Sequence, residues 1–193
     1  PSLNVGFKPS KIFKKFAHKS PMLSLGNAFD EEDLLNFEKK ILNFLNLEKG
    51  FKIEYSAEPK IDGISASLIY IDGKFQRGLS RGDGKQGEDI TANLKTIADI
   101  PERILDKEFP KEIDVRGEVF IQNSDFKSLK NKFANPRNAA SGSLRQKNPL
   151  ETKKIPLKFI AYTYGFEKGL KVKNQKDFLL LLKKWGFKTN PLN

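Results

Sequence analysis

One lysine stands in a context that suits a nucleophile. Lys60 lies in the run Glu58-Pro59-Lys60-Ile61-Asp62-Gly63, which predicts a strand end followed by an exposed turn. A glycine at Gly63 lets a ligand or a second backbone approach closely. At its reference pKa of roughly 10.4, well under about 1% of a lysine is neutral near pH 7. Such a side chain becomes a useful nucleophile when it is desolvated or crowded by other cations.

Later segments contain cations that could crowd Lys60, namely Arg81, Arg116, Arg137 and Arg145. Asp62 by itself acts in the opposite direction, because a neighbouring carboxylate raises the pKa of a lysine. The pattern K-x-D-G arises by chance in about one chain of this length in twenty at average composition. The motif alone therefore leaves open that Lys60 is an ordinary solvated lysine.

The composition describes a basic, globular chain. The 193 residues carry a formal net charge of +11, with 38% hydrophobic and 31% charged residues. An excess of positive charge favours a polyanionic partner such as nucleic acid, although a lysine-rich genome would produce the same excess. The sequence has no cysteine, so it holds neither disulfides nor cysteine-ligated zinc. It also has no apolar run of membrane-spanning length and no signal-peptide pattern at its start.

The elements that must position these residues are mixed helices and strands. Residues 1–29 read as irregular, and Asp30 caps a helix in which Leu34, Phe37, Ile41 and Leu45 recur at helical spacing. Alternating apolar residues predict strands over 64–71 and 74–80, joined by a hairpin turn at Asp72-Gly73. Further helices are expected over 89–97, over 124–133, within 138–146 and from Asn174 to Trp185, and Ser124 is expected to cap the second of them. Further strands are expected over 113–121 and 157–164. Without βαβ regularity this order indicates an α+β fold.

Six blocks of the sequence together resemble a known family. They are HKSPMLSLGNAF, EPKIDG, SRGDGKQGED, VRGEVF, ANPRNAASGSLRQ and FIAYTYG, in that order. In wording and order they are similar to the adenylation domain of bacterial NAD-dependent DNA ligases, from about Lys14 to Trp185. The resemblance implies an α+β nucleotidyltransferase fold of antiparallel sheets flanked by helices. It also implies that residues 1–193 are one incomplete adenylation domain, lacking two downstream lysine motifs and the oligonucleotide-binding, zinc, helix-hairpin-helix and BRCT parts.

The resemblance further implies roles for single residues. Lys60 matches the lysine that attacks the α-phosphate of NAD and becomes lysyl-AMP. The positions that match NAD-contacting residues are Ser24, Leu25, Glu58, Asp62, Gly63, Arg81, Glu118 and Tyr162. Among these, Glu58 matches a residue on the adenine side, Tyr162 an aromatic that stacks on adenine, and Arg81 and Glu118 groups around the ribose and the phosphate. Arg137 and Arg145 match arginines implicated in contacts to DNA or to the nicked-end phosphate.

Several of these positions also have plain structural interpretations. Leu25 could be a core leucine after a turn, and Tyr162 lies in an apolar strand that predicts burial. Glu118 could form a buried ion pair with Arg116 or Arg81. His18, the single histidine, is interpreted as structural.

For the whole enzyme, the resemblance implies NAD⁺ as co-substrate, Mg²⁺ or Mn²⁺ as cofactor, and nicked duplex DNA as partner. Zinc is expected only in parts outside these residues, and no metal ligand, membrane or protein partner is inferred here. The whole enzyme is expected to lie in the bacterial cytoplasm, near the nucleoid. It is expected to act in DNA replication and repair. Residues 1–193 alone are expected to be inactive or weakly active. Two alternatives remain at this stage: another lysyl-adenylate transferase, such as an ATP-dependent ligase, and a nonenzymatic basic module that binds nucleic acid.

Overall fold

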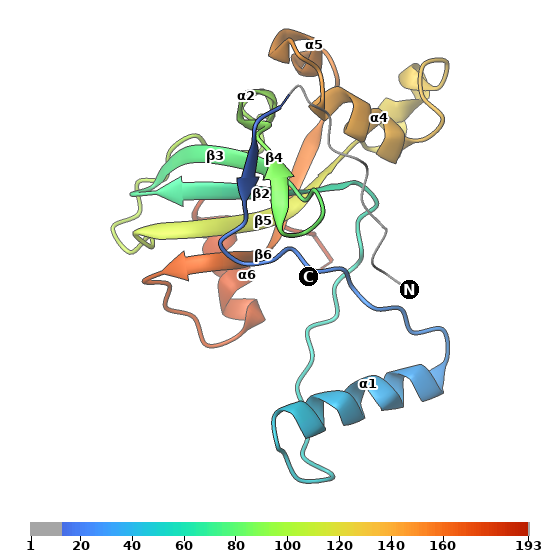
Figure 1. Ribbon diagram of the computed structural model, residues 1–193, viewed down its shortest axis with the longest axis vertical. Coiled ribbons are helices and arrows are strands. Elements are labelled where there is room, and N and C mark those ends of the chain that lie inside the picture. The colour runs from blue at the N-terminus through green and yellow to red at the C-terminus, as the bar shows by residue number, and fades with distance from the viewer. Residues whose placement is uncertain (1–12, 193) are drawn as a thin grey trace. The chain divides into compact units, whose positions relative to one another are not determined.

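Two antiparallel sheets organise the computed structural model, which describes residues 13–192 (Figure 1). The larger sheet has the strand order β3-β2-β5-β6 and the smaller one pairs β1 with β4. The strands are β1 (Lys15–Ala17), β2 (Ile64–Ile71), β3 (Lys74–Ser80), β4 (Gln86–Glu88), β5 (Glu112–Phe120) and β6 (Lys158–Lys168). The antiparallel sheets and their helices confirm the predicted α+β class.

The helices are mostly short. They are α1 (Glu31–Phe44), α2 (Thr91–Leu94), α3 (Asn123–Phe126) with the 3₁₀ turn η1 (Lys127–Leu129), α4 (Pro136–Leu144), α5 (Pro149–Lys153) and α6 (Gln175–Lys184). Asp30 and Asn174 cap α1 and α6 as predicted, since each side chain accepts a bond from the backbone N–H three residues on. No helix within residues 13–192 is both long and apolar enough to cross a membrane.

The chain divides into two compact units. One comprises the residues up to Met22 together with those from Glu58 onward, and the other comprises Leu23–Ala57. The second unit contains α1, and within it the Phe37 and Tyr55 rings lie 6.3 Å apart. Both sheets belong to the first unit.

The two faces of the large sheet differ in character. On β2, the side chains of Ala66, Leu68 and Tyr70 are completely buried in the core. The alternating residues Ser65 and Ser67 stand on the other face. In the β2–β5 register, Ser65 lies opposite Glu118 and Ser67 opposite Arg116. One face of the sheet is thus apolar core, and the other is a polar face lined by serine, arginine and carboxylate side chains.

An aromatic cluster fills the core side. The Tyr70 ring lies 5.3 Å from that of Phe75 and 5.7 Å from that of Phe187. Its hydroxyl donates to the Pro101 carbonyl at 2.6 Å, so the one polar atom of this buried ring is satisfied. The Phe178 ring of α6 packs against Tyr164 of β6 at 4.8 Å, which holds α6 against the large sheet.

The segment from residue 14 to 22 is bound to β4 and to the loop between β3 and β4. Figure 1 shows β1 and β4 crossing the large sheet in front of β2 and β5. The His18 amide donates to Lys85 O and the Met22 amide to Gly84 O, both at 2.9 Å. The Arg116 guanidinium of β5 also donates to the carbonyls of Ser20 and Pro21. These bonds hold the segment over the polar face.

Several sequence predictions need correction. Lys60 is not in a strand, because residues 51–62 have no regular structure and β2 begins only at Ile64. The expected helices over 89–97 and 124–133 shrink to α2 and to α3 with η1, and the N-cap of α3 is Gln122 rather than Ser124. Strands β1 and β4 and helix α5 were not predicted, since three to five residues carry too little periodicity to be read. Of residues 1–29, expected to be irregular, 1–12 lie outside the described part.

Candidate active site

Gly63 brings the Lys60 turn against β5. A Cβ atom on Gly63 would lie 2.3 Å from the Val119 carbonyl oxygen and 2.9 Å from Cγ of Glu118. Glycine is therefore required here for the close approach of a second backbone, as the sequence predicted. Lys60 is exposed and lies four residues before the start of β2. It therefore stands at the end of the polar face.

Glu118 is the buried carboxylate at this end of the sheet. Its side chain accepts a hydrogen bond from Ser65 Oγ at 3.0 Å and from the Tyr162 hydroxyl at 3.5 Å. Burial raises the pKa of Glu118, and the positive charges of Arg137 and Lys60 act against that rise. Strands β2, β5 and β6 thus contribute to one polar cluster, together with residues 58–63, which are called the nucleophile turn below.

Tyr162 is half-buried and faces this cluster rather than only the core. Burial, and then the Glu118 carboxylate, raise the pKa of its hydroxyl to about 12. The phenol is therefore a neutral hydrogen-bond donor at physiological pH. An aromatic ring that borders the polar cluster is a suitable surface for a purine.

Arg137 comes to the nucleophile turn from the first turn of α4. Asn135 caps this helix by accepting from the Asn138 amide, and Pro136 follows at the first helical position, where proline is favoured. Arg137 Nη1 donates to Asp62 Oδ1 at 3.0 Å, and both side chains remain substantially exposed, at 49% and 78%. A residue matched by resemblance to DNA contacts thus binds the carboxylate two positions after Lys60.

Glu58 is held by a residue that the sequence did not single out. Gln175, the first residue of α6, donates from Nε2 to Glu58 Oε1 at 2.8 Å and to the Tyr162 carbonyl at 2.7 Å. The amide thereby joins the segment before Lys60 to β6. No sequence signal indicated it, because a glutamine after a helix cap has no distinctive pattern.

Arg81 follows β3 directly and is bound to the segment that crosses the polar face. Its Nε donates to the Met22 carbonyl at 3.3 Å, and its own carbonyl accepts from His18 Nε2 at 3.1 Å. His18 therefore makes a backbone contact that supports its interpretation as structural. The two contacts fix the Arg81 loop relative to residues 18–22.

The other arginines expected near Lys60 bind different carboxylates. Arg116 pairs with Asp114 at 2.9 Å, not with Glu118. Arg145, at the end of α4, donates to Glu88 at 3.1 Å, and the Glu88 side chain is almost fully buried. Arg145 therefore ties α4 to β4, and Arg137 is the arginine whose charge acts on the same carboxyl as that of Lys60.

Ser24 and Leu25 belong to the second unit, residues 23–57. Leu25 is 77% exposed, so it is not the core leucine of the structural alternative. Their role in NAD contact rests on the resemblance alone.

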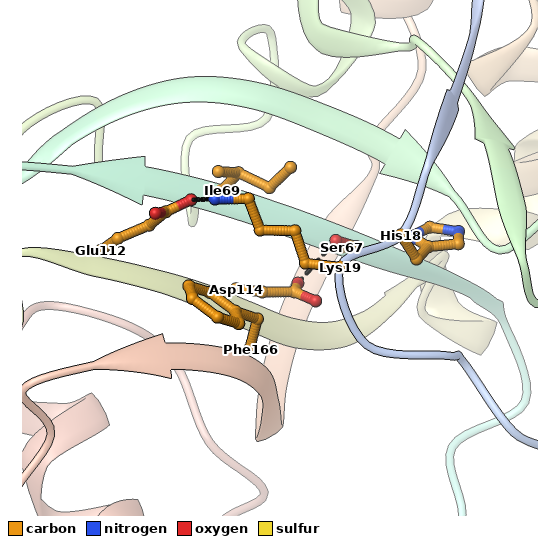
Figure 2. Close-up of a pocket in the computed structure, with 7 residues that line it drawn as sticks. All are labelled: His18, Lys19, Ser67, Ile69, Glu112, Asp114 and Phe166. Atoms are coloured by element: carbon orange, nitrogen blue, oxygen red, sulfur yellow. Dashed lines mark hydrogen bonds and ion pairs between the residues drawn. The ribbon is translucent and has the colours of Figure 1, made fainter.

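A small pocket lies where residues 18–19 cover the polar face. Figure 2 shows Lys19 reaching the Glu112 carboxylate and Ser67 bonded to Asp114. The Lys19 ammonium also lies 4.7 Å from the centre of the Phe166 ring. The pocket volume of ≈ 10 Å³ is near the lower limit for one water molecule, so a nucleotide does not fit there.

Comparison with known proteins gives the same family as the motifs. The family described as NAD-dependent DNA ligase adenylation domain matches residues 10–193. A DNA ligase of Pelagibacter ubique is 74% identical over all 193 residues, and one of Parvibaculum lavamentivorans is 48% identical over the whole chain. The chain spans only 29% and 28% of the lengths of these two relatives. The chain belongs to the NAD-dependent DNA ligase adenylation domain family.

Proposed function

We propose that the full-length protein containing this chain is an NAD-dependent DNA ligase with Lys60 as its nucleophile. The observation that carries the proposal is the meeting of the Lys60 turn, Glu118, Tyr162 and Arg137, which come from four separate segments. Membership of the adenylation family supports the same assignment. Adenylate transfer needs such a set, with a nucleophilic amine, cations near a phosphate and a face for a purine.

In the proposed first step, the neutral Lys60 amine attacks the α-phosphorus of NAD. The Nζ–P bond forms as the P–O bond to nicotinamide mononucleotide breaks, and the nitrogen then loses a proton to give the phosphoramidate. AMP next passes to the 5′-phosphate of nicked duplex DNA, which restores the free lysine. Attack by the 3′-hydroxyl on that phosphate seals the nick and releases AMP. Replication and repair are the processes that supply such nicks.

The remaining residues are assigned from the resemblance to the family. Glu58, held by Gln175, is proposed to lie on the adenine side, and Tyr162 is proposed to stack on the base. Arg81 and Glu118 are proposed to bind the ribose and the phosphate. Asp62 and Gly63 complete the nucleophile turn. Ser24 and Leu25 are proposed, from the resemblance alone, to contact NAD.

Magnesium belongs to this proposal through the family, not through a site in these residues. Within residues 13–192 no group of three histidine, cysteine or acidic side chains is arranged to hold a metal ion. The ion is therefore not assigned to any residue of this chain.

DNA binding is proposed to use the basic surface. Arg137 and Arg145 are the proposed DNA contacts, and they form salt bridges with Asp62 and Glu88, respectively. Phosphates would exchange with these partners, at low cost for the exposed Asp62 and at higher cost for the buried Glu88. Binding of nicked duplex should weaken steeply with salt, because lysines and arginines that neutralise phosphates release counterions.

Intact mass spectrometry of the full-length protein tests the assignment. Incubation with NAD and magnesium should give one AMP adduct, located on Lys60, whereas ATP should give none. Lys60→Arg should abolish the adduct because a guanidinium stays protonated, and Lys95→Arg, at another exposed lysine, should retain it. An equal adduct from ATP would assign the protein to the ATP-dependent class. Absence of any adduct, with DNA binding intact, would assign it to nonenzymatic nucleic-acid-binding modules.

A further inference from the structure

Gln175 contacts both residues that the proposed function assigns to the adenine base. Its Nε2 atom donates to Glu58 Oε1 at 2.8 Å and to the Tyr162 carbonyl oxygen at 2.7 Å. Glu58 lies 117 residues away along the chain, and Tyr162 lies 13 residues away. One side-chain amide therefore joins the start of the nucleophile turn to β6.

The two partners determine which end of the Gln175 amide faces them. Both partner atoms are acceptors, one a carboxylate oxygen and the other a carbonyl oxygen. Only the NH₂ end of a glutamine side chain can donate two hydrogen bonds, and its oxygen would be repelled at this place. The bond to Glu58 has a charged acceptor, which places it in the stronger class of hydrogen bonds.

The Glu58 side chain lies on a segment that cannot position it alone. Residues 51–62 have no regular structure, so no strand or helix sets the direction of this carboxylate. Gln175 is the first residue of α6, which packs on β6 through the Phe178 and Tyr164 rings at 4.8 Å. The amide thus links a carboxylate on an irregular segment to a helix that is fixed against the large sheet.

We propose that Gln175 is a positioning residue for the adenine base, which holds the Glu58 carboxylate where it accepts from the adenine amino group. The inference rests on the proposed function. A carboxylate only accepts hydrogen bonds, so it suits the exocyclic NH₂ of adenine and opposes a carbonyl oxygen at the same place. Gln175 therefore contributes to the selection of an adenine dinucleotide over its hypoxanthine counterpart.

The experiment measures single-turnover self-adenylation of the full-length protein with NAD and with nicotinamide hypoxanthine dinucleotide, each over a range of concentrations. Gln175→Ala should raise the NAD concentration that gives the half-maximal rate by about tenfold, because Glu58 loses its donor. The maximal rate at saturating NAD should stay within about twofold, since the change affects binding and not the reacting atoms. The half-maximal concentration of the hypoxanthine dinucleotide should change by less than about twofold, so the preference for adenine falls.

The variants are chosen to keep the fold. Gln175→Ala retains the Asn174 cap, whose side chain accepts from the Asp177 amide, and alanine favours a helix, so Tm should be retained. Gln175→Glu keeps the shape of the side chain but places an acceptor against Glu58, and it should weaken NAD at least as much. Lys176→Ala, at the next and exposed position of α6, is the matched control and should leave both half-maximal concentrations unchanged.

Two results would overturn the inference. One is an unchanged half-maximal NAD concentration in both Gln175 variants. The other is an equal rise for the two dinucleotides, which would indicate a general loss of the pocket rather than a displaced Glu58 carboxylate. Failure of the wild-type protein to form any adduct with NAD would instead refute the proposed function.

Discussion

Replacing Gly63 with alanine tests whether close backbone approach positions the nucleophile turn. The added Cβ would lie 2.3 Å from the Val119 carbonyl oxygen and 3.0 Å from Cβ of Phe120. Carbon and carbonyl oxygen normally stay at least about 3.3 Å apart, so the turn or the end of β5 must move by about 1 Å. Neither obstacle is a flexible side-chain end, because one is backbone and the other is the first atom of a side chain.

The cost follows from that displacement. Overpacking by one methyl group against rigid atoms destabilises a domain by about 1–3 kcal/mol. For a domain of this size, each kcal/mol lowers Tm by about 2–4 °C. A misplacement of about 1 Å at a reacting group can also lower the rate by about 10²-fold. Gly63→Ala should therefore lose far more self-adenylation activity than its stability loss explains.

Calorimetry and single-turnover adenylation of the full-length protein measure both effects. Gly142→Ala is the matched control, because the nearest atom to its new Cβ is Phe133 Cε1 at 3.4 Å, an ordinary contact. In the middle of α4 this change should stabilise the protein by about 0.5–1 kcal/mol. Wild-type Tm and rate in Gly63→Ala would refute the reasoning that β5 dictates glycine at this position.

Four further results are expected. Tyr70→Phe should lower the free energy of unfolding by about 1 kcal/mol, measured by denaturant titration, because the part-buried hydrogen bond from the Tyr70 hydroxyl to the Pro101 carbonyl is lost. Glu118→Gln should raise Tm at neutral pH and lose this advantage in acid. Burial raises the folded-state pKa of Glu118 above its unfolded value. The wild-type carboxyl therefore destabilises the fold least below its unfolded pKa, and it destabilises the fold as pH rises through its folded pKa. Arg145→Ala should lower Tm, since it removes the salt-bridge partner of the buried Glu88, and a second change of Glu88→Gln should recover part of the loss in a thermal melt. The isolated 193-residue chain should form no stoichiometric AMP adduct within minutes by mass spectrometry, and an adduct on that timescale would show that it holds a sufficient site.

The sequence was most informative where a local pattern has one physical solution. The alternation of residues 64–71 and the Asp72-Gly73 pair specified the β2–β3 hairpin, in which both turn residues have positive φ, of 48° and 73°. Asp30 and Asn174 were identified as helix caps because only their own chain neighbours are involved. The family was also readable from the chain, because six short blocks in a fixed order do not depend on where they lie in space.

Only the tertiary structure decided which charges meet. Arg81, Arg116, Arg137 and Arg145 were equivalent candidates to crowd Lys60, because the sequence gives a type and a position but no partner. Strand register places Glu118 opposite Ser65, and the start of α4 brings Arg137 to Asp62 across 75 residues of chain. Arg116 and Arg145 are instead bound to Asp114 and Glu88. Such pairings depend on packing between distant segments, and for that reason local patterns predicted the elements and the family but not the electrostatics of the nucleophile.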